Sequence, residues 1–194
     1  MRASKEVKSI LLAGVGGQGV LRASDVLCLV VMEVGMDVKK SEVHGMAQRG
    51  GCVTSHVRYG KKVYSPIAKK GDVDILVSFE KLEALRYLDF LKPHCAIIIN
   101  EKELYPPSVN LGDAHYPDNI IEIIKNSFKF VKIVNAGDIA LKAGDIRAEN
   151  TALLGVLSQY LKIDLSLWEK VIHTSFPEKA IAANLNAFHM GRAA

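Results

Sequence analysis

The feature that most constrains the fold of this chain is a glycine-rich turn that directly follows a short apolar stretch. Residues 10–13 read Ile-Leu-Leu-Ala, and residues 14–19 read Gly-Val-Gly-Gly-Gln-Gly. This order predicts a buried strand, a tight turn and a helix that begins at about Gly17. Amides at a helix start are unpaired and lie at the positive end of the helix dipole, so such a turn can bind an anion. It can equally pack against another protein, and both alternatives stay open here.

Strand and helix patterns alternate along the rest of the chain. Strands are expected at residues 8–13, 37–43, 73–79, 95–100 and 130–134. Helices are expected at residues 17–34, 80–91, 118–127, 149–161, 165–175 and 178–190, with a short one starting at 135. Pro93 is expected to end the helix that starts at residue 80, and Asp118 to cap the next one.

One segment interrupts this rhythm. Residues 52–58 alternate in strand fashion, residues 59–61 form a turn, and residues 62–65 return, which predicts an inserted β-hairpin. The whole pattern predicts an α/β fold in a single domain over residues 1–194. We expect a three-layer sandwich with a mixed, mostly parallel sheet, a β-hairpin insertion and a helical C-terminus.

Composition excludes several classes of protein. The 194 residues are 49% hydrophobic and carry a net charge of +4, spread over scattered lysine pairs without interleaved aromatics, so no nucleic-acid partner is expected. Cys28, Cys52 and Cys95 are too far apart for a disulfide framework, a zinc site or an iron–sulfur motif, which favours a reduced, cytoplasmic setting. The longest apolar run, residues 26–32, is too short to span a membrane, and no secretion signal is visible.

The glycine turn also satisfies the dinucleotide pattern G-x-G-x-x-G with Gly14, Gly16 and Gly19. A dinucleotide-binding fold needs an acidic residue after its second strand to hold the ribose, and Glu42 lies near that position. However, the chain then enters a glycine-rich loop and a hairpin instead of a second helix. Three alternatives therefore remain: NAD binding in a stand-alone oxidoreductase, contact with an anionic group of another ligand, and a turn that serves only structure or docking.

A second polar cluster follows the second expected strand. Residues 42–51 read Glu-Val-His-Gly-Met-Ala-Gln-Arg-Gly-Gly and end a strand, so we expect this loop to lie beside the glycine turn. Arg49 could bind a phosphate or carboxylate with two hydrogen bonds, and His44 could donate a proton or a hydrogen bond. The alternative is that these polar groups only satisfy the loop backbone.

Further along, residues 147–151 group polar side chains where a long apolar helix begins. Capping of that helix by Asn150 or Thr151 and a role in an interface explain this equally well. No Ser/His/Asp set, metal-ligand cluster or carboxylate pair stands out, so this chain is not expected to perform chemistry alone.

The two glycine-rich segments, in this order, resemble the gamma-domain family of 2-oxoacid:ferredoxin oxidoreductases. Agreement extends to residues 75–80, 83–87, 150–151 and 187–188, and covers about residues 7–193. Within the family, Val-His-Gly-Met-Ala-Gln-Arg at residues 43–49 is most similar to the beta subunit of indolepyruvate:ferredoxin oxidoreductases. A gamma subunit of a pyruvate-type or 2-oxoglutarate-type enzyme is the alternative within the family.

The resemblance implies a subunit of an enzyme that oxidatively decarboxylates aryl pyruvates, forms the coenzyme A thioester and passes electrons to ferredoxin, in anaerobic catabolism of aromatic amino acids. Thiamine diphosphate, Mg and [4Fe-4S] clusters would belong to a large partner subunit, with no membrane involved. None of these groups is expected to bind this chain alone, whether coenzyme A touches it stays open, and no metal ligand is expected in it. The resemblance makes His44 and Arg49 candidate contributors to catalysis, and it implies these cofactor contacts: Gly14, Gly16, Gly17, Gln18, Gly19, Gln48 and Arg49.

Overall fold

The computed structural model describes residues 7–45 and 51–194, with the side chain of His44 excepted. Six strands form one sheet in the order β2-β3-β1-β4-β5-β6. The strands are β1 (Lys8–Val15), β2 (Asp37–His44), β3 (Cys52–Gly60), β4 (Val73–Ser78), β5 (Leu91–Asn100) and β6 (Phe130–Val134). β1, β4, β5 and β6 pair in parallel, while β3 runs antiparallel to both of its neighbours, β1 and β2. The expected mixed, mostly parallel sheet is therefore confirmed.

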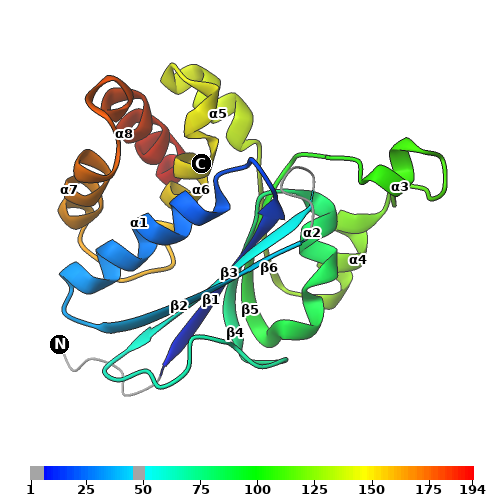
Figure 1. The fold of residues 1–194 in the computed structure, drawn as a ribbon, viewed down its shortest axis with the longest axis horizontal. Helices are drawn as coiled ribbons and strands as arrows, with labels where there is room; N and C mark the ends of the chain where they lie inside the picture. The colour runs from blue at the N-terminus through cyan, green and yellow to red at the C-terminus, as the bar shows by residue number, and fades with distance from the viewer. Residues whose placement is uncertain (1–6, 46–50) are drawn as a thin grey trace.

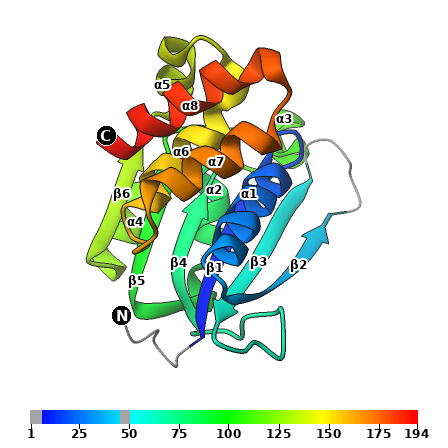
Figure 2. The ribbon, with the colours of Figure 1, turned by 90° about the vertical axis from the view of Figure 1, so that its left-hand side faces the viewer.

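Helices cover both faces of this sheet, which gives the three expected layers (Figure 1). The larger layer holds α1 (Val20–Glu33), α5 (Ala136–Ala143), α6 (Glu149–Ser158), α7 (Leu165–Ser175) and α8 (Glu178–Ala193). The smaller layer holds α2 (Lys81–Arg86) and α4 (Ile120–Ser127). Figure 2 shows α6 between the sheet and the outer helices α7 and α8. None of the helices in the described ranges is long and apolar enough to cross a membrane.

β3 takes part in a hairpin, but its partner strand precedes it in the sequence and does not follow it as expected. β3 pairs with β2, residue Asp37 facing Gly60 and His44 facing Val53, whereas residues 62–65 form no strand. The reason lies at the start of β2: the Asp37 carboxylate accepts a hydrogen bond from the Val63 amide at 2.9 Å and pairs with Lys62. The segment after β3 is thereby fixed across the end of the sheet and cannot return along β3.

Two boundaries in the smaller layer also differ from expectation. α2 ends at Arg86, a 3-10 turn (Leu88–Phe90) follows, and β5 starts at Leu91, so Pro93 lies inside a strand and does not end the helix. Proline is tolerated there because the pairing of β4 with β5 shifts its register between Val73 and Ile75. The N-cap residue of α4 is Asn119, and its side chain makes no capping hydrogen bond. The expected cap at Asp118 is therefore wrong.

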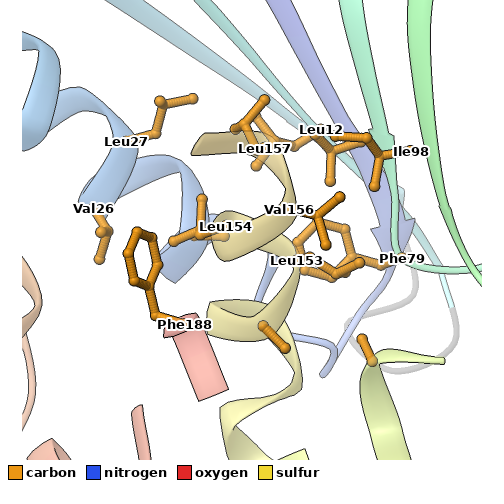
Figure 3. Packing of buried hydrophobic residues seen from close by; sticks show 14 of the residues in the cluster. Leu12, Val26, Leu27, Phe79, Ile98, Leu153, Leu154, Val156, Leu157 and Phe188 are labelled. Carbon is orange, nitrogen blue, oxygen red and sulfur yellow. The ribbon is translucent and has the colours of Figure 1, made fainter. Parts of the chain in front are cut away.

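The core of the larger layer is centred on α6, whose ten residues are all buried. Leu153, Leu154, Val156 and Leu157 pack between α1, the sheet and Phe188 of α8 (Figure 3). α6 and α8 also approach each other closely enough that a Cβ on Gly155 would lie 2.1 Å from the Phe188 carbonyl oxygen. α6 is thus held on every side, which fixes the position of the polar residues at its N-terminus.

Candidate functional site

The glycine turn joins β1 to α1 at the carboxyl edge of the parallel strands. The Gln18 side chain holds it: its Oε1 accepts from the Val15 amide at 2.7 Å, and its Nε2 donates to the Phe79 carbonyl at 2.8 Å. Gly17 and Gly19 have φ of +101° and +76°, values that favour glycine. Because these conformations are not helical, α1 begins at Val20 and not at about Gly17 as expected.

Several amides of the turn have no acceptor among residues 7–45 and 51–194. The described residues supply none to the amides of Gly17, Gly19 and Val20, and no described side chain caps α1. The first turn of α1 holds no acidic residue and includes the exposed Arg22. Unpaired amides at the positive end of a helix dipole, with Gly17 exposed, suit a negatively charged group.

Other residues of the turn have structural roles. Gly14 is buried, and a Cβ there would lie 2.8 Å from the Phe79 Cβ and from the Val20 Cγ2. A Cβ on Gly19 would lie 2.6 Å from the Asn150 Nδ2. Close approach therefore requires glycine at position 14, and the left-handed backbone favours it at position 19. The amide group of Gln18 is already engaged at both ends. Within the predicted contact set, the geometry leaves Gly17 and Gly19 most available to a ligand.

The second polar loop starts and ends beside this turn, as expected. The Gly16 amide donates to the Gly51 carbonyl at 2.9 Å, and Val15 faces Cys52 across the sheet. The Gly45 amide closes the loop at its base by donating to the Cys52 carbonyl at 2.8 Å. Gln48 and Arg49 lie outside the described residues. Of His44 only the backbone, at the end of β2, is described.

This sheet order argues against a dinucleotide site at Glu42. In a dinucleotide-binding fold the second strand lies next to the first and parallel to it. Here β3 separates β2 from β1, so Glu42 lies two strand spacings, about 10 Å, from the strand that carries the glycine turn. Glu42 is instead ion-paired with Lys40, 2.5 Å from its Nζ.

The structure adds residues that the sequence reasoning missed. Asn100, at the end of β5, is buried and donates to the Phe79 carbonyl at 3.1 Å and to the Glu149 Oε1 at 2.7 Å. Its own Oδ1 accepts from the Ala136 amide at 3.0 Å. Lys102 then pairs with Glu149 at 2.7 Å. The rule that polar groups gather at the carboxyl ends of parallel strands would have pointed to Asn100 and Lys102.

The polar segment before α6 braces the site and does not cap the helix. The N-cap position is Ala148, without a side-chain hydrogen bond, so capping by Asn150 or Thr151 is wrong. Asn150 donates from its Nδ2 to the Gly19 carbonyl at 3.3 Å, while the Thr151 hydroxyl donates to the Asn184 Oδ1 of α8 at 2.6 Å. The glycine turn is therefore tied to α6, and α6 in turn to α8.

A buried carboxyl group lies beside Cys52, the first residue of β3, on the face of the sheet that α2 covers. Glu83 of α2 is 3% exposed, and its Oε1 accepts from the Cys52 thiol at 3.3 Å and pairs with Arg86 at 3.1 Å. Burial raises the pKa of Glu83 above its usual range and, together with the nearby Glu83 charge, raises the pKa of Cys52. Neither group is thus set up as a strong nucleophile or a metal ligand.

The other thiols are also kept protonated. Burial raises the pKa of Cys28 to about 11 and that of Cys95 to about 12. Within residues 7–45 and 51–194, no three His, Cys, Asp or Glu side chains are grouped as a metal ion would need. The site thus consists of the glycine turn, a second loop whose described ends lie beside it, and a network of buried polar side chains at one edge of the sheet.

Comparison with known proteins gives the class of this chain. Residues 9–194 match the family described as pyruvate ferredoxin/flavodoxin oxidoreductase, and the chain belongs to that family. Its fold is that of the pyruvate oxidoreductase subunit PORC from Thermotoga maritima, with a TM-score of 0.73 at 23% identity over 97% of both chains. The 2-oxoglutarate:ferredoxin oxidoreductase from Magnetococcus marinus contains the same fold, with a TM-score of 0.74 at 21% identity, covering 98% of this chain but only 31% of that one.

Sequence similarity is higher to one particular kind of subunit. The chain is 39% identical over 187 residues to the indolepyruvate oxidoreductase subunit IorB of Archaeoglobus fulgidus, covering 94% of this chain and 92% of that protein. It is also 39% identical over 189 residues to IorB of Thermococcus kodakarensis, with 94% and 93% covered. Similarity to the 2-oxoglutarate synthase subunit KorC of Methanothermobacter thermautotrophicus is lower, 27% over 199 residues.

Proposed function

We propose that this chain is the small subunit of an indolepyruvate:ferredoxin oxidoreductase. The observation that carries the proposal is its 39% identity to IorB proteins over nearly the full length of both. The reaction would be the coenzyme A-dependent oxidative decarboxylation of aryl pyruvates, with electrons passed to ferredoxin in the cytoplasm. The lower identity to KorC favours this branch over a 2-oxoglutarate-type enzyme.

In this proposal a large partner subunit holds thiamine diphosphate, Mg and the [4Fe-4S] clusters. Thiamine diphosphate supplies the carbanion stabilisation that decarboxylation of a 2-oxoacid needs, and the clusters carry electrons. Two features of this chain support that division. Its cysteines are separate in sequence, with raised thiol pKa values, and no metal-binding group of side chains occurs in the described ranges.

The contribution of this chain would be binding and shape. The amides of Gly17, Gly19 and Val20, which no described residue engages, would fit a phosphate or carboxylate of a ligand held between the subunits. His44, Gln48 and Arg49, on the neighbouring loop, would add side-chain contacts, while Gly14, Gly16 and Gln18 shape the turn. Coenzyme A, which the Magnetococcus enzyme holds together with 2-oxoglutarate and succinyl-CoA, is the candidate source of such an anionic group.

Reconstitution tests the assignment. The chain is co-expressed with a candidate large subunit from the same organism, and dye reduction is measured with coenzyme A and indolepyruvate, pyruvate or 2-oxoglutarate. We expect turnover only with both subunits, and fastest with indolepyruvate. Equal turnover by the large subunit alone would refute the proposal, and a preference for pyruvate or 2-oxoglutarate would move the chain to another branch of its family.

Two further measurements separate the alternatives. Calorimetry of the purified chain with NAD and NADP tests a stand-alone dinucleotide enzyme, for which binding is not expected. Arg49→Ala and His44→Ala, measured in the assembled complex, test a scaffold role. We expect a higher KM for coenzyme A or a lower kcat, with Lys69→Ala, an exposed basic residue near the opposite edge of the sheet, as the control. Unchanged rates in an intact complex would favour the scaffold.

A further inference from the structure

The segment between β5 and α4 projects from the body of the molecule as an arm. We define the arm as residues 103–118, which include the short helix α3 (Pro107–Asn110). Figure 1 shows it extending beyond α2 and α4, away from both helical layers. A projection of this kind buries little of its own apolar surface, so its exposed side chains call for a physical explanation.

The root of the arm is fixed to the candidate site. The buried carboxylate of Glu80 accepts from the Leu104 amide at 3.2 Å and from the Tyr116 hydroxyl, and thus holds both ends of the arm. Glu80 directly follows Phe79, whose carbonyl accepts from Gln18 of the glycine turn. A protein that covers the glycine turn therefore meets the arm at the same edge of the sheet.

The arm keeps its form through internal contacts. The Asn110 Nδ2 donates to the Tyr105 carbonyl at 3.0 Å, and the rings of Tyr105 and Tyr116 lie 5.2 Å apart. Arm residues alone, among them Val109 and His115, line a hollow of about 390 Å³. Large apolar groups nevertheless face solvent: Leu111 is 77% exposed and Tyr105 is 53% exposed. A preformed, partly apolar tip suits insertion into another protein, because it loses little conformational freedom on binding.

The charge of the arm is opposite to that of the rest of the chain. The arm holds three acidic residues, Glu103, Asp113 and Asp118, and neither Lys nor Arg, in a chain whose net charge is +4. Glu103 pairs with Lys81 at 2.8 Å, but Asp113 and Asp118 form no ion pair with any residue in the described ranges. Asp113, two residues from the exposed Leu111, and Asp118, at the root of the arm, give an acidic and partly apolar surface that a cationic, apolar-lined pocket would complement.

We propose that the arm docks into the large, cofactor-bearing partner subunit, with Leu111 in an apolar pocket and Asp113 and Asp118 against Lys or Arg at its rim. This inference rests on the proposed function, which supplies the partner. It adds a second anchor, away from the glycine turn, that sets how this subunit sits over the reaction centre. The arm is then a binding element and not a contributor of catalytic groups.

The test measures assembly, separately from activity. The large subunit is immobilised, and the dissociation constant of the purified chain is measured at low and high salt. Leu111→Ser should weaken binding at least about tenfold, as expected for truncating a central apolar anchor. Asp113→Lys/Asp118→Lys should weaken it at low salt and reduce its salt dependence. The control is Tyr64→Ser, since Tyr64 is 89% exposed on the segment that leaves the far end of β3.

The outcomes are distinct. If both arm variants bind like the wild type while the complex still turns over indolepyruvate, the arm proposal is wrong and the proposed function stands. If the wild-type chain neither binds the large subunit nor restores turnover, the proposed function fails, and the docking proposal with it. A change confined to self-association of this chain, measured by sedimentation, would assign the arm to a second copy and overturn the proposal. Circular dichroism of each variant confirms that its fold is unchanged.

Discussion

The contact between α6 and α8 allows a prediction in which two physical effects have opposite signs. Gly155 lies within α6, where replacing glycine by alanine ordinarily stabilises a helix by up to about 1 kcal/mol. However, a Cβ on Gly155 would lie 2.1 Å from the Phe188 carbonyl oxygen and 2.8 Å from the Arg192 amide nitrogen. Both are backbone atoms of a helix, so neither can move aside as the end of a flexible side chain could.

Relief of this clash requires the two helices to separate. An ordinary contact begins at 3.4 Å, so α6 and α8 would move apart by about 1.3 Å at this point. A gap of that size loses more than about half of the dispersion energy of the contacts it opens. Overpacking of a core is typically destabilising by up to about 3 kcal/mol. After the gain in helix propensity, we expect Gly155→Ala to lower the free energy of unfolding by roughly 2 kcal/mol.

Thermal denaturation of the purified chain measures this effect. For a domain of this size, roughly 2 kcal/mol corresponds to a fall in Tm of about 4–8 °C. The matched control is Gly137→Ala in α5, where the nearest atom to a Cβ lies at 3.5 Å and the change should be neutral or slightly stabilising. A Tm for Gly155→Ala equal to or above that of the wild type would show that the helices are less tightly opposed than the structure indicates.

Three further predictions concern buried or partly buried polar groups. Gln18→Ala removes the acceptor of the Val15 amide and should lower the free energy of unfolding by about 1–3 kcal/mol in urea denaturation. Asn100→Ala leaves the buried Ala136 amide unpaired and should lower it by a similar amount. Burial raises the pKa of Glu83 above its unfolded value of 4.5, so the wild type loses stability as the pH rises above about 4.5. Glu83→Gln should therefore gain Tm relative to the wild type as the pH is raised from that point towards neutral.

Each of these has an outcome that would contradict it. An unchanged urea midpoint for Gln18→Ala or Asn100→Ala would mean that water replaces the lost partner, and that the group is more accessible than its burial indicates. A difference in Tm between Glu83→Gln and the wild type that stays constant across that pH range would mean that Glu83 titrates normally.

Much of the fold follows from local patterns in the sequence. The strand, glycine turn and helix at the start of the chain are specified by consecutive residues, and so is the helical end. The predicted partner of β3 is wrong. Residues 62–65 resemble a strand locally, but β3 pairs with the full length of β2. Helix α2 was predicted too long because Pro93 indicated a helix end, although the edge of a register shift also accepts proline.

The candidate site was only partly predictable, for a related reason. The closeness of the two glycine-rich segments followed from a general rule for parallel strands. The network of Asn100 with Glu149, by contrast, joins side chains 49 residues apart, and no local pattern relates them. The role of Asn150 was equally hidden, because a polar residue at a helix start ordinarily indicates a cap and here it reaches another element.

The brace from Asn150 to Gly19 has a consequence for the order in which the protein matures on the ribosome. These two residues are 131 positions apart in the sequence. Until α6 has emerged from the ribosome, the glycine turn of the nascent chain therefore lacks the hydrogen bond from Asn150. The first element to be synthesised is thus among the last to acquire its final form. Any binding at this turn, as proposed above, is then expected to follow the folding of α6.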